Sequence, residues 1–185
     1  MILDEGPQVP AAGRSEADAN ESKQAAPRPR EARQSRMAHS FSQVVAVLMR
    51  DPNFRNLRLA DLEWLVLPPV MSGQFRLAQA PAPQARTKGQ DGGMLIPVAV
   101  ALWARVSDAV DRALAQNLDK QMRLRPGDWV SGDNLWLMVV GGDERAVPTF
   151  LKQLGEKEFA GKQVKLRTRG PDGTVVVKTL GEYKP

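Results

Sequence analysis

The spacing of apolar residues predicts where the folded part of the chain begins. Ser40 is followed three residues later by Gln43, which is the pattern of a capping box, so we expect a first helix to start at Ser40. Asp51 precedes Pro52, and a residue before proline disfavours helical geometry, so this helix should stop there. The apolar positions at helical spacing predict one buried face, formed by Phe41, Val44, Val45 and Leu48.

Three further helices are predicted along the chain. A short one is expected over residues 59–67, ended by Pro68 and Pro69, because proline lacks the amide hydrogen that a helix interior needs. Another covers residues 106–118, and a last one follows the Gly141-Gly142 breaker and contains Pro148, which is tolerable only in the first turn. The predicted inward positions are Leu59, Leu62, Leu65 and Val66 in the short helix, and Val147, Phe150, Leu151 and Leu154 in the last.

Two kinds of strand pattern lie between these helices. Residues 74–79 alternate polar with apolar side chains, as a half-buried strand does. Residues 94–103 and 135–140 are nearly continuous apolar runs, which are typical of central strands buried on both faces. Residues 80–93 combine prolines, glycines and polar residues, so we expect a loop there.

The chain closes on a predicted hairpin. Residues 164–168 and 175–180 flank the turn sequence at residues 170–173, Gly-Pro-Asp-Gly. The resulting order, ααββαβαββ, describes a mixed central sheet flanked by helices, in the α/β (α+β) class. A chain of 185 residues with 42% hydrophobic content is long enough for a single domain with a real core.

The first 36 residues differ from the rest. They are rich in Ala, Pro, Gln, Glu and Arg and contain no aromatic residue, so they cannot bury enough surface to offset the entropy of ordering. We expect a disordered or marginally helical arm over residues 1–36 and one folded domain over residues 37–185. The arm could wrap a partner, although a variable tail is the simpler interpretation.

Composition excludes several kinds of chemistry. The chain has no cysteine, so disulfides and thiolate nucleophiles are impossible. His39 is its single histidine, so no two-histidine metal site can form, and we expect neither a metal nor a bound cofactor. No run approaches the roughly 20 apolar residues of a membrane span, and the N-terminus lacks a secretion signal, so a cytoplasmic location without a membrane span is expected.

The net charge of +5 raises the question of an acidic partner. Lys165, Arg167 and Arg169 would share one face of a strand, which could meet such a partner or could simply be solvated. No tyrosine or phenylalanine is interleaved with these charges to stack on bases. Nucleic acid is therefore not an expected partner.

One stretch carries a specific resemblance. Residues 128–133 read Asp-Trp-Val-Ser-Gly-Asp and are followed by Trp136 and by Gly142-Asp143. Residues 51–56, Asp-Pro-Asn-Phe-Arg-Asn, come earlier, as do the Val-Leu-Pro at residues 66–68, the Pro-Val-Ala at 97–99 and the Trp-Ala at 103–104. In order and spacing these segments resemble the RTX toxin-activating lysine acyltransferases, over roughly residues 41–180.

The resemblance implies a GNAT-like fold and a fatty acyl transfer. Members of that family take an acyl chain from acyl carrier protein and pass it to an internal lysine of an RTX protoxin, and they often form dimers. Such a transfer needs a base for the lysine ammonium, a group that stabilises the resulting charge, and donors for the thioester oxyanion. The family fills the first two roles with a histidine and an aspartate.

The chain departs from the family at both of these positions. Phe54 stands where the resemblance places the histidine, and Val139 stands where it places the aspartate. Neither side chain can accept a proton, and loss of a general base typically costs about 100- to 10,000-fold in rate. We expect Phe54 and Val139 to lie close together and to line an apolar pocket. Eight residues keep the family's identity and are candidates for substrate binding, although each also has a structural interpretation: Arg55, Asn56, Trp103, Trp129, Ser131, Gly132, Asp133 and Trp136.

Two functional hypotheses follow. In the first, the chain is a catalytically impaired homologue that binds an acyl group, acyl carrier protein, an RTX-type protein or a second acyltransferase subunit. In the second, it is an active lysine acyltransferase that uses substitute groups such as Glu63, Asp133 or His39. The paired glycines at 141 and 142 could aim backbone amides at a carbonyl or phosphate, or could form a turn.

Overall fold

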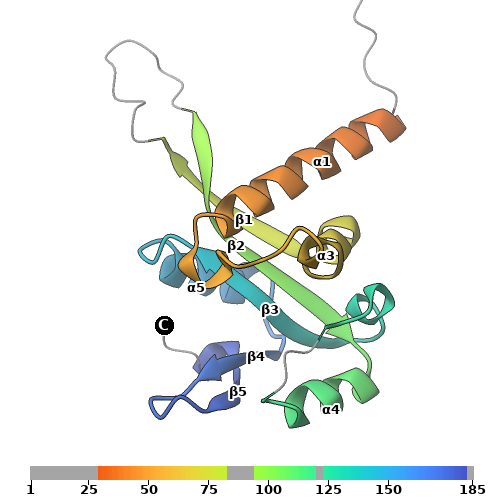
Figure 1. Ribbon diagram of the computed structural model, residues 1–185, viewed down its shortest axis with the longest axis vertical. Helices are drawn as coiled ribbons and strands as arrows, with labels where there is room; N and C mark the ends of the chain where they lie inside the picture. Colours follow the sequence, from red (N-terminus) through yellow and green to blue (C-terminus); the bar gives the residue numbers. More distant parts are fainter. Residues whose placement is uncertain (1–28, 83–93, 120–122, 183–185) are drawn as a thin grey trace, which may run out of the picture.

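The computed structural model describes residues 29–82, 94–119 and 123–182, and within them the fold is α+β. A five-stranded mixed sheet forms the centre of the molecule (Figure 1). Its strands are β1 (Phe75–Pro81), β2 (Leu95–Val106), β3 (Asn134–Gly142), β4 (Val164–Arg169) and β5 (Val175–Thr179). The helices are α1 (Pro29–Leu48), α2 (Asp61–Leu65), α3 (Leu67–Ser72), α4 (Asp108–Gln116) and α5 (Val147–Lys157), with short 3-10 turns η2 (Pro52–Phe54), η3 (Pro126–Trp129) and η4 (Leu180–Glu182).

The strands follow one another across the sheet in chain order, from β1 to β5. All neighbours are antiparallel except β3 and β4, which are parallel and are connected through α5. The middle of β2, from Ala99 to Ala104, is buried on both faces of the sheet. The predicted mixed sheet with two central apolar strands is therefore confirmed, and the fold is consistent with a GNAT-like arrangement.

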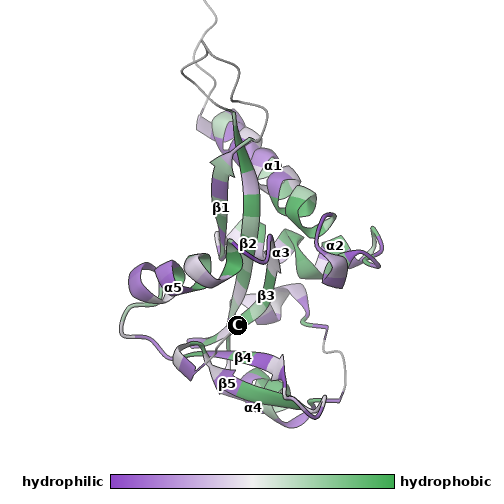
Figure 2. Cartoon of the chain, turned by 90° about the vertical axis from the view of Figure 1, so that its left-hand side faces the viewer, coloured by the Kyte–Doolittle hydropathy of each residue, from purple (hydrophilic) through white to green (hydrophobic). Residues whose placement is uncertain are grey.

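Helices cover the sheet on both faces. Figure 2 shows α1 and α5 on opposite sides of β2 and β3, whose ribbons are largely hydrophobic. On the α1 side, Val44 and Leu48 pack with Leu102 and Trp136. On the α5 side, a second core joins the residues Ala101, Trp103, Leu137, Phe150, Leu154 and Leu166. The inward faces predicted for α1 and α5 are thus confirmed.

The pairing between β3 and β4 is short, and this shapes the site. Leu135, Trp136 and Leu137 pair with residues 164–166, but β3 continues to Gly142 without a partner on that side. The two strands therefore diverge beyond Leu137. Because a parallel pair that separates leaves a gap between its carboxyl ends, this is where the sheet can admit another molecule.

The start of the first helix differs from the prediction. Helix α1 begins at Pro29, so Ser40 lies inside the helix and the capping-box interpretation is wrong. Residues 29–36 are rich in Arg, Gln, Glu and Ala, which are strong helix formers, and Pro29 fits the first turn. His39 is likewise inside α1 rather than ahead of it. Residues 1–28 of the predicted arm lie outside the described residues.

The second predicted helix is also corrected. Residues 59–67 do not form one helix: α2 is limited to Asp61–Leu65, and Leu59 is 88% exposed rather than inward. Pro68 and Pro69 do not end a helix but open the next one, α3, because the first turn of a helix does not use their missing amide hydrogens. Helix α3 ends at Gly73, which adopts a left-handed conformation with φ of 73°.

Most of the other elements match the prediction. Helix α4 is capped by the hydroxyl of Ser107, α5 carries Pro148 in its first turn, and β4 and β5 form the closing hairpin. Of the loop predicted over residues 80–93, residues 80 and 81 belong to β1, and residues 83–93 lie outside the described part. Among the described residues, no helix has the length and apolar character to cross a membrane.

Candidate functional site

The Asp51 carboxylate fixes the turn that carries Phe54. Its Oδ1 atom accepts a hydrogen bond of 2.8 Å from the amide of Asn53, which caps η2, and its Oδ2 atom accepts one of 2.8 Å from the amide of Gly142. Asp51 is only 5% exposed. A buried carboxylate with two backbone donors therefore ties η2 to the end of β3, although 91 residues separate Asp51 and Gly142 in the chain.

Gly141 allows Phe54 to approach the strand closely. A Cβ atom at this position would lie 2.9 Å from Oδ2 of Asp51 and 3.0 Å from the ring of Phe54, so a side chain there would displace one of them. Gly141 and Gly142 are the last residues of β3 rather than a breaker after it, and Gly142 has φ of 132°. Because residues two apart share a strand face, Val139 points to the same side as Gly141.

Phe54 and Val139 line one cavity of about 300 Å³, which we call the Phe54–Val139 cavity. It lies where β3 and β4 diverge. Val139 is 3% exposed, and Phe54 is partly buried. The two residues thus border a common cavity, but Asn53 and Arg167 make its lining partly polar rather than wholly apolar as expected. The cavity is also lined by Leu57, Trp64, Leu114, Trp136, Met138 and Arg167.

Among the described residues that line this cavity, Arg167 alone is charged. Its guanidinium donates hydrogen bonds to the carbonyl oxygen of Leu114, including one of 3.1 Å from Nε, which holds the side chain against the end of α4. Partial burial lowers the pKa of Arg167, while the nearby charge of Asp119 raises it. The pKa of a guanidinium stays far above neutral pH, so Arg167 keeps its positive charge.

A second polar cluster joins α4 to β4 behind the cavity. Asp111 accepts a hydrogen bond of 2.7 Å from Nε1 of Trp136 and two of 2.8 and 2.9 Å from Nζ of Lys165. Burial raises the pKa of Asp111, but the hydrogen bonds from Lys165 and Trp136 outweigh it and hold the pKa below its usual value. Lys165 and Arg167 thus contact α4, whereas Arg169, the third residue of the predicted basic strand face, is exposed.

The Asp-Trp-Val-Ser-Gly-Asp segment secures the junction between β2 and β3. Trp129 is fully buried, and the hydroxyl of Ser131 accepts a hydrogen bond of 2.9 Å from the amide of Ser107. A Cβ atom on Gly132 would lie 2.5 Å from the carbonyl oxygen of Val106, so only glycine fits there. These contacts give the segment a structural role in positioning β3.

The geometry can be compared with known proteins. A sequence model described as the RTX toxin acyltransferase family matches residues 33–180. The chain belongs to this family. No curated protein sequence matches the chain at a significant level. As an RTX toxin acyltransferase family member it carries the family's fold, with Phe54 and Val139 at the positions where the resemblance places a histidine and an aspartate.

The substitute bases considered for this family member lie outside the Phe54–Val139 cavity. His39 is exposed on α1 and Glu63 is exposed on α2. Asp133 has a side chain that is 93% exposed, and it pairs with Arg105 at 2.7 Å. None of the three lines the cavity.

The remaining family-identical residues are spread over the molecule. Arg55 and Asn56 are exposed just after η2. Trp103 lies on the opposite face of the sheet, where it lines a separate cavity of about 640 Å³ together with Asp133. The structure therefore brings Trp136 to the Phe54–Val139 cavity but not Trp103 or Asp133.

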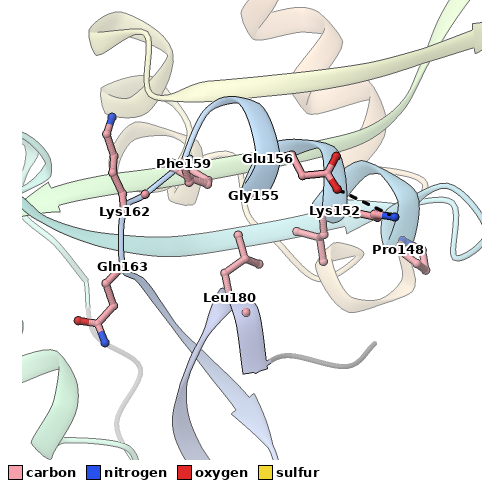
Figure 3. A pocket seen from close by; sticks show the side chains of 11 residues that line it. Pro148, Lys152, Gly155, Glu156, Phe159, Lys162, Gln163 and Leu180 are labelled. Carbon is pink, nitrogen blue, oxygen red and sulfur yellow. Dashed lines mark ion pairs between the residues drawn. The ribbon is translucent and has the colours of Figure 1, made fainter.

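A larger cavity, of about 810 Å³, borders none of the candidate residues. Figure 3 shows it between α5 and the Leu180 side chain of η4, with Lys152 and Glu156 paired at 4.0 Å on its rim. Within residues 29–82, 94–119 and 123–182, no three acidic or histidine side chains gather closely enough to hold a metal ion.

Three residues important to the site escaped the sequence analysis. The sequence pattern gives Asp51 only the role of a helix stop and places Arg167 on a basic strand face, and it assigns no role to Asp111. The resemblance offers one signal for Asp51, because Asp51 belongs to the segment at residues 51–56 that carries it and stands three residues before Phe54. Asp111 and Arg167 depend on contacts between α4 and β4, which have no local pattern.

Proposed function

We propose that this protein is a catalytically impaired RTX toxin acyltransferase that binds an acyl group, delivered by acyl carrier protein, in the Phe54–Val139 cavity. The observation that carries the proposal is the lining of that cavity. Phe54 and Val139 border the same cavity of about 300 Å³, and none of its lining side chains accepts a proton near neutral pH. The site keeps the shape of a binding pocket while it lacks a base.

The chemistry of lysine acylation explains why this lining matters. The attacking amine must lose a proton from the ammonium form, and a positioned base contributes about 100- to 10,000-fold to such a step. Phenylalanine and valine supply no such base. An apolar wall instead favours contact with an acyl chain, since burial of each CH₂ group contributes about 0.8 kcal/mol. We therefore place the protein with an RTX-type partner in the cytoplasm, as an acyl-binding or accessory subunit.

One observation supports the alternative of an active enzyme. Asp51 is a carboxylate close to Phe54, and both would contact a Cβ atom placed on Gly141. Its two oxygens already accept hydrogen bonds from the amides of Asn53 and Gly142, which favours a structural role. Asp51 is nevertheless the base to test first, ahead of His39, Glu63 and Asp133.

Acyl transfer from labelled acyl carrier protein to an RTX protein tests the proposal. We expect little or no transfer by the wild-type protein, and transfer by a family member that has both histidine and aspartate, assayed in parallel. Robust wild-type transfer that survives Phe54→Ala but is abolished by Asp51→Asn, His39→Ala, Glu63→Gln or Asp133→Asn would overturn the impaired-enzyme proposal. Binding of acyl carrier protein, measured separately, tests delivery of the acyl group.

A further inference from the structure

We propose that Trp64 limits the length of the acyl chain that the Phe54–Val139 cavity accepts. The inference rests on the proposed function, because it concerns the same cavity and the same acyl group, and it names the residue that selects between chains. Trp64 lines the cavity from α2, and contacts with Asp61 and Arg123 hold its indole in place.

Much of the cavity wall belongs to the core of the domain. Five of its side chains, from α2, α4 and β3, are between 1% and 6% exposed: Leu65, Leu114, Trp136, Leu137 and Val139. Protein interiors are close-packed, so these side chains yield little without a loss of stability. A wall residue outside the buried core is therefore better placed to set the room for a chain.

Trp64 is the largest of the wall residues outside the buried core. It is partly buried, and it packs against the core cluster that contains Leu65 and Leu114. Its ring therefore covers apolar surface that further CH₂ groups of a ligand could cover instead. Removing the indole should open apolar space next to the cavity.

Asp61 anchors the indole of Trp64. Its Oδ1 atom accepts a hydrogen bond of 3.0 Å from Nε1 of Trp64, and its Oδ2 atom accepts one of 3.0 Å from the amide of Arg58, just before α2. The hydrogen bonds from Trp64 and Arg58 lower the pKa of Asp61, so its carboxylate is charged at neutral pH. The anchor is thus present before any ligand binds.

Arg123 reinforces the anchor from a distant part of the chain. Its guanidinium pairs with Oδ1 of Asp61 at 2.8 Å, and its central carbon lies 5.1 Å from the centre of the Trp64 ring. A cation over an aromatic face is attracted to it, so both contacts favour one position of the indole. Arg123 is exposed and does not line the cavity, so Asp61 and Arg123 are positioning residues that act on a ligand through Trp64.

Binding of acyl carrier protein that carries an 8-carbon or a 12-carbon chain tests the inference. Isothermal titration calorimetry compares each loaded carrier with the same carrier without a chain, so that contacts with the carrier protein cancel. The shorter chain suits a cavity of about 300 Å³, which lies at the small end of ligand sites.

We expect the wild-type protein to gain affinity from the 8-carbon chain and nothing further from the 12-carbon chain. Trp64→Ala should bind the 12-carbon chain roughly tenfold more tightly than the 8-carbon chain, as the burial of two more CH₂ groups provides. Asp61→Ala and Arg123→Gln keep the indole but release it. Each should shift the ratio of the two affinities in the same direction by less than Trp64→Ala does.

Arg125→Gln is the matched control for Arg123→Gln. Arg125 lies two residues after Arg123, is exposed and does not line the cavity, so its replacement should leave both affinities unchanged. A shift in the ratio as large as that of Arg123→Gln would contradict the anchor. Melting temperatures of all variants establish that they are folded.

The outcomes separate this inference from the proposed function. If the loaded carriers bind no more tightly than the unloaded one, the cavity holds no acyl chain, and the proposed function and the inference both fail. If the chain adds affinity but Trp64→Ala keeps the wild-type ratio, the inference alone is overturned. A wild-type protein that already prefers the 12-carbon chain tenfold also overturns the inference alone, and that comparison applies even if Trp64→Ala fails to fold.

Discussion

At the scale of single residues, Phe54 and Val139 were identified from sequence, while their surroundings were not. Their substitution is visible in the sequence because the family resemblance places a histidine and an aspartate at these two positions. Asp51 joins the site through the amide of Gly142, 91 residues away, and no local pattern reports such a bond. The position of Arg167 is equally hidden from the sequence, because it depends on a hydrogen bond to the carbonyl oxygen of Leu114 on α4.

Restoring the polar pair should lower stability and raise activity. Phe54→His with Val139→Asp places polar groups against a wall where Val139 is 3% exposed, and an unsatisfied buried polar group costs about 1 to 3 kcal/mol. We expect a lower free energy of unfolding in urea together with some acyl transfer from acyl carrier protein. Val139→Leu is the apolar control and should show no transfer. Unchanged stability in the double variant would show that the positions are not enclosed.

Asp111 should make stability depend on pH. Its folded-state pKa lies below the usual value, so its contribution is present above the unfolded pKa of about 3.9 and is lost as the pH falls through the lower folded value. Asp111→Asn should lower the free energy of unfolding by about 1 to 3 kcal/mol at neutral pH. It should also make the free energy of unfolding fall less steeply as the pH is lowered. Urea unfolding between pH 2 and 7 measures this. Glu144→Gln, at an exposed position, is the control, and an equal effect there would contradict the assignment.

At the scale of elements, the strands and most helices followed from apolar periodicity, because that signal is local. The errors have local causes as well. Pro68 and Pro69 suggested an end where α3 begins, since proline suits both the residue after a helix and its first turn. Ser40 suggested a start inside α1, because a capping pattern can also occur by chance within a helix.

The junction between β2 and β3 should be intolerant of any side chain at position 132. Gly132→Ala would place a Cβ atom 2.5 Å from the carbonyl oxygen of Val106, and overpacking of this kind costs about 1 to 3 kcal/mol. Thermal unfolding should show a clear drop in melting temperature. Gly127→Ala, in the preceding turn η3, meets nothing within 4 Å and should change the melting temperature little. Equal drops in melting temperature at both positions would argue against a close approach of Gly132 to the carbonyl oxygen of Val106.

At the scale of the whole molecule, removing residues 1–36 should leave the melting temperature nearly unchanged. The part of α1 that this deletion removes, residues 29–36, is exposed except for the partly buried Ala32, whereas Val44, Val47 and Leu48 are buried further along. Thermal unfolding at two protein concentrations measures the effect. A fall of several degrees would show that the arm packs on the domain or on a second subunit. Leu48→Ala, expected to cost about 2 to 5 kcal/mol, confirms that the assay detects lost packing.

The short pairing of β3 with β4 has a mechanical consequence. Only residues 135–137 and 164–166 pair between the two strands. The β4–β5 hairpin is therefore joined to the three-stranded part of the sheet, β1 to β3, by a short backbone ladder. Hydrogen exchange should accordingly be faster for the backbone amides of β4 than for those of β2. Equal exchange rates would show that the short pairing of β3 with β4 does not weaken this side of the sheet. The position of the hairpin against β3 then depends on side-chain contacts with α4 and α5 rather than on a long backbone ladder.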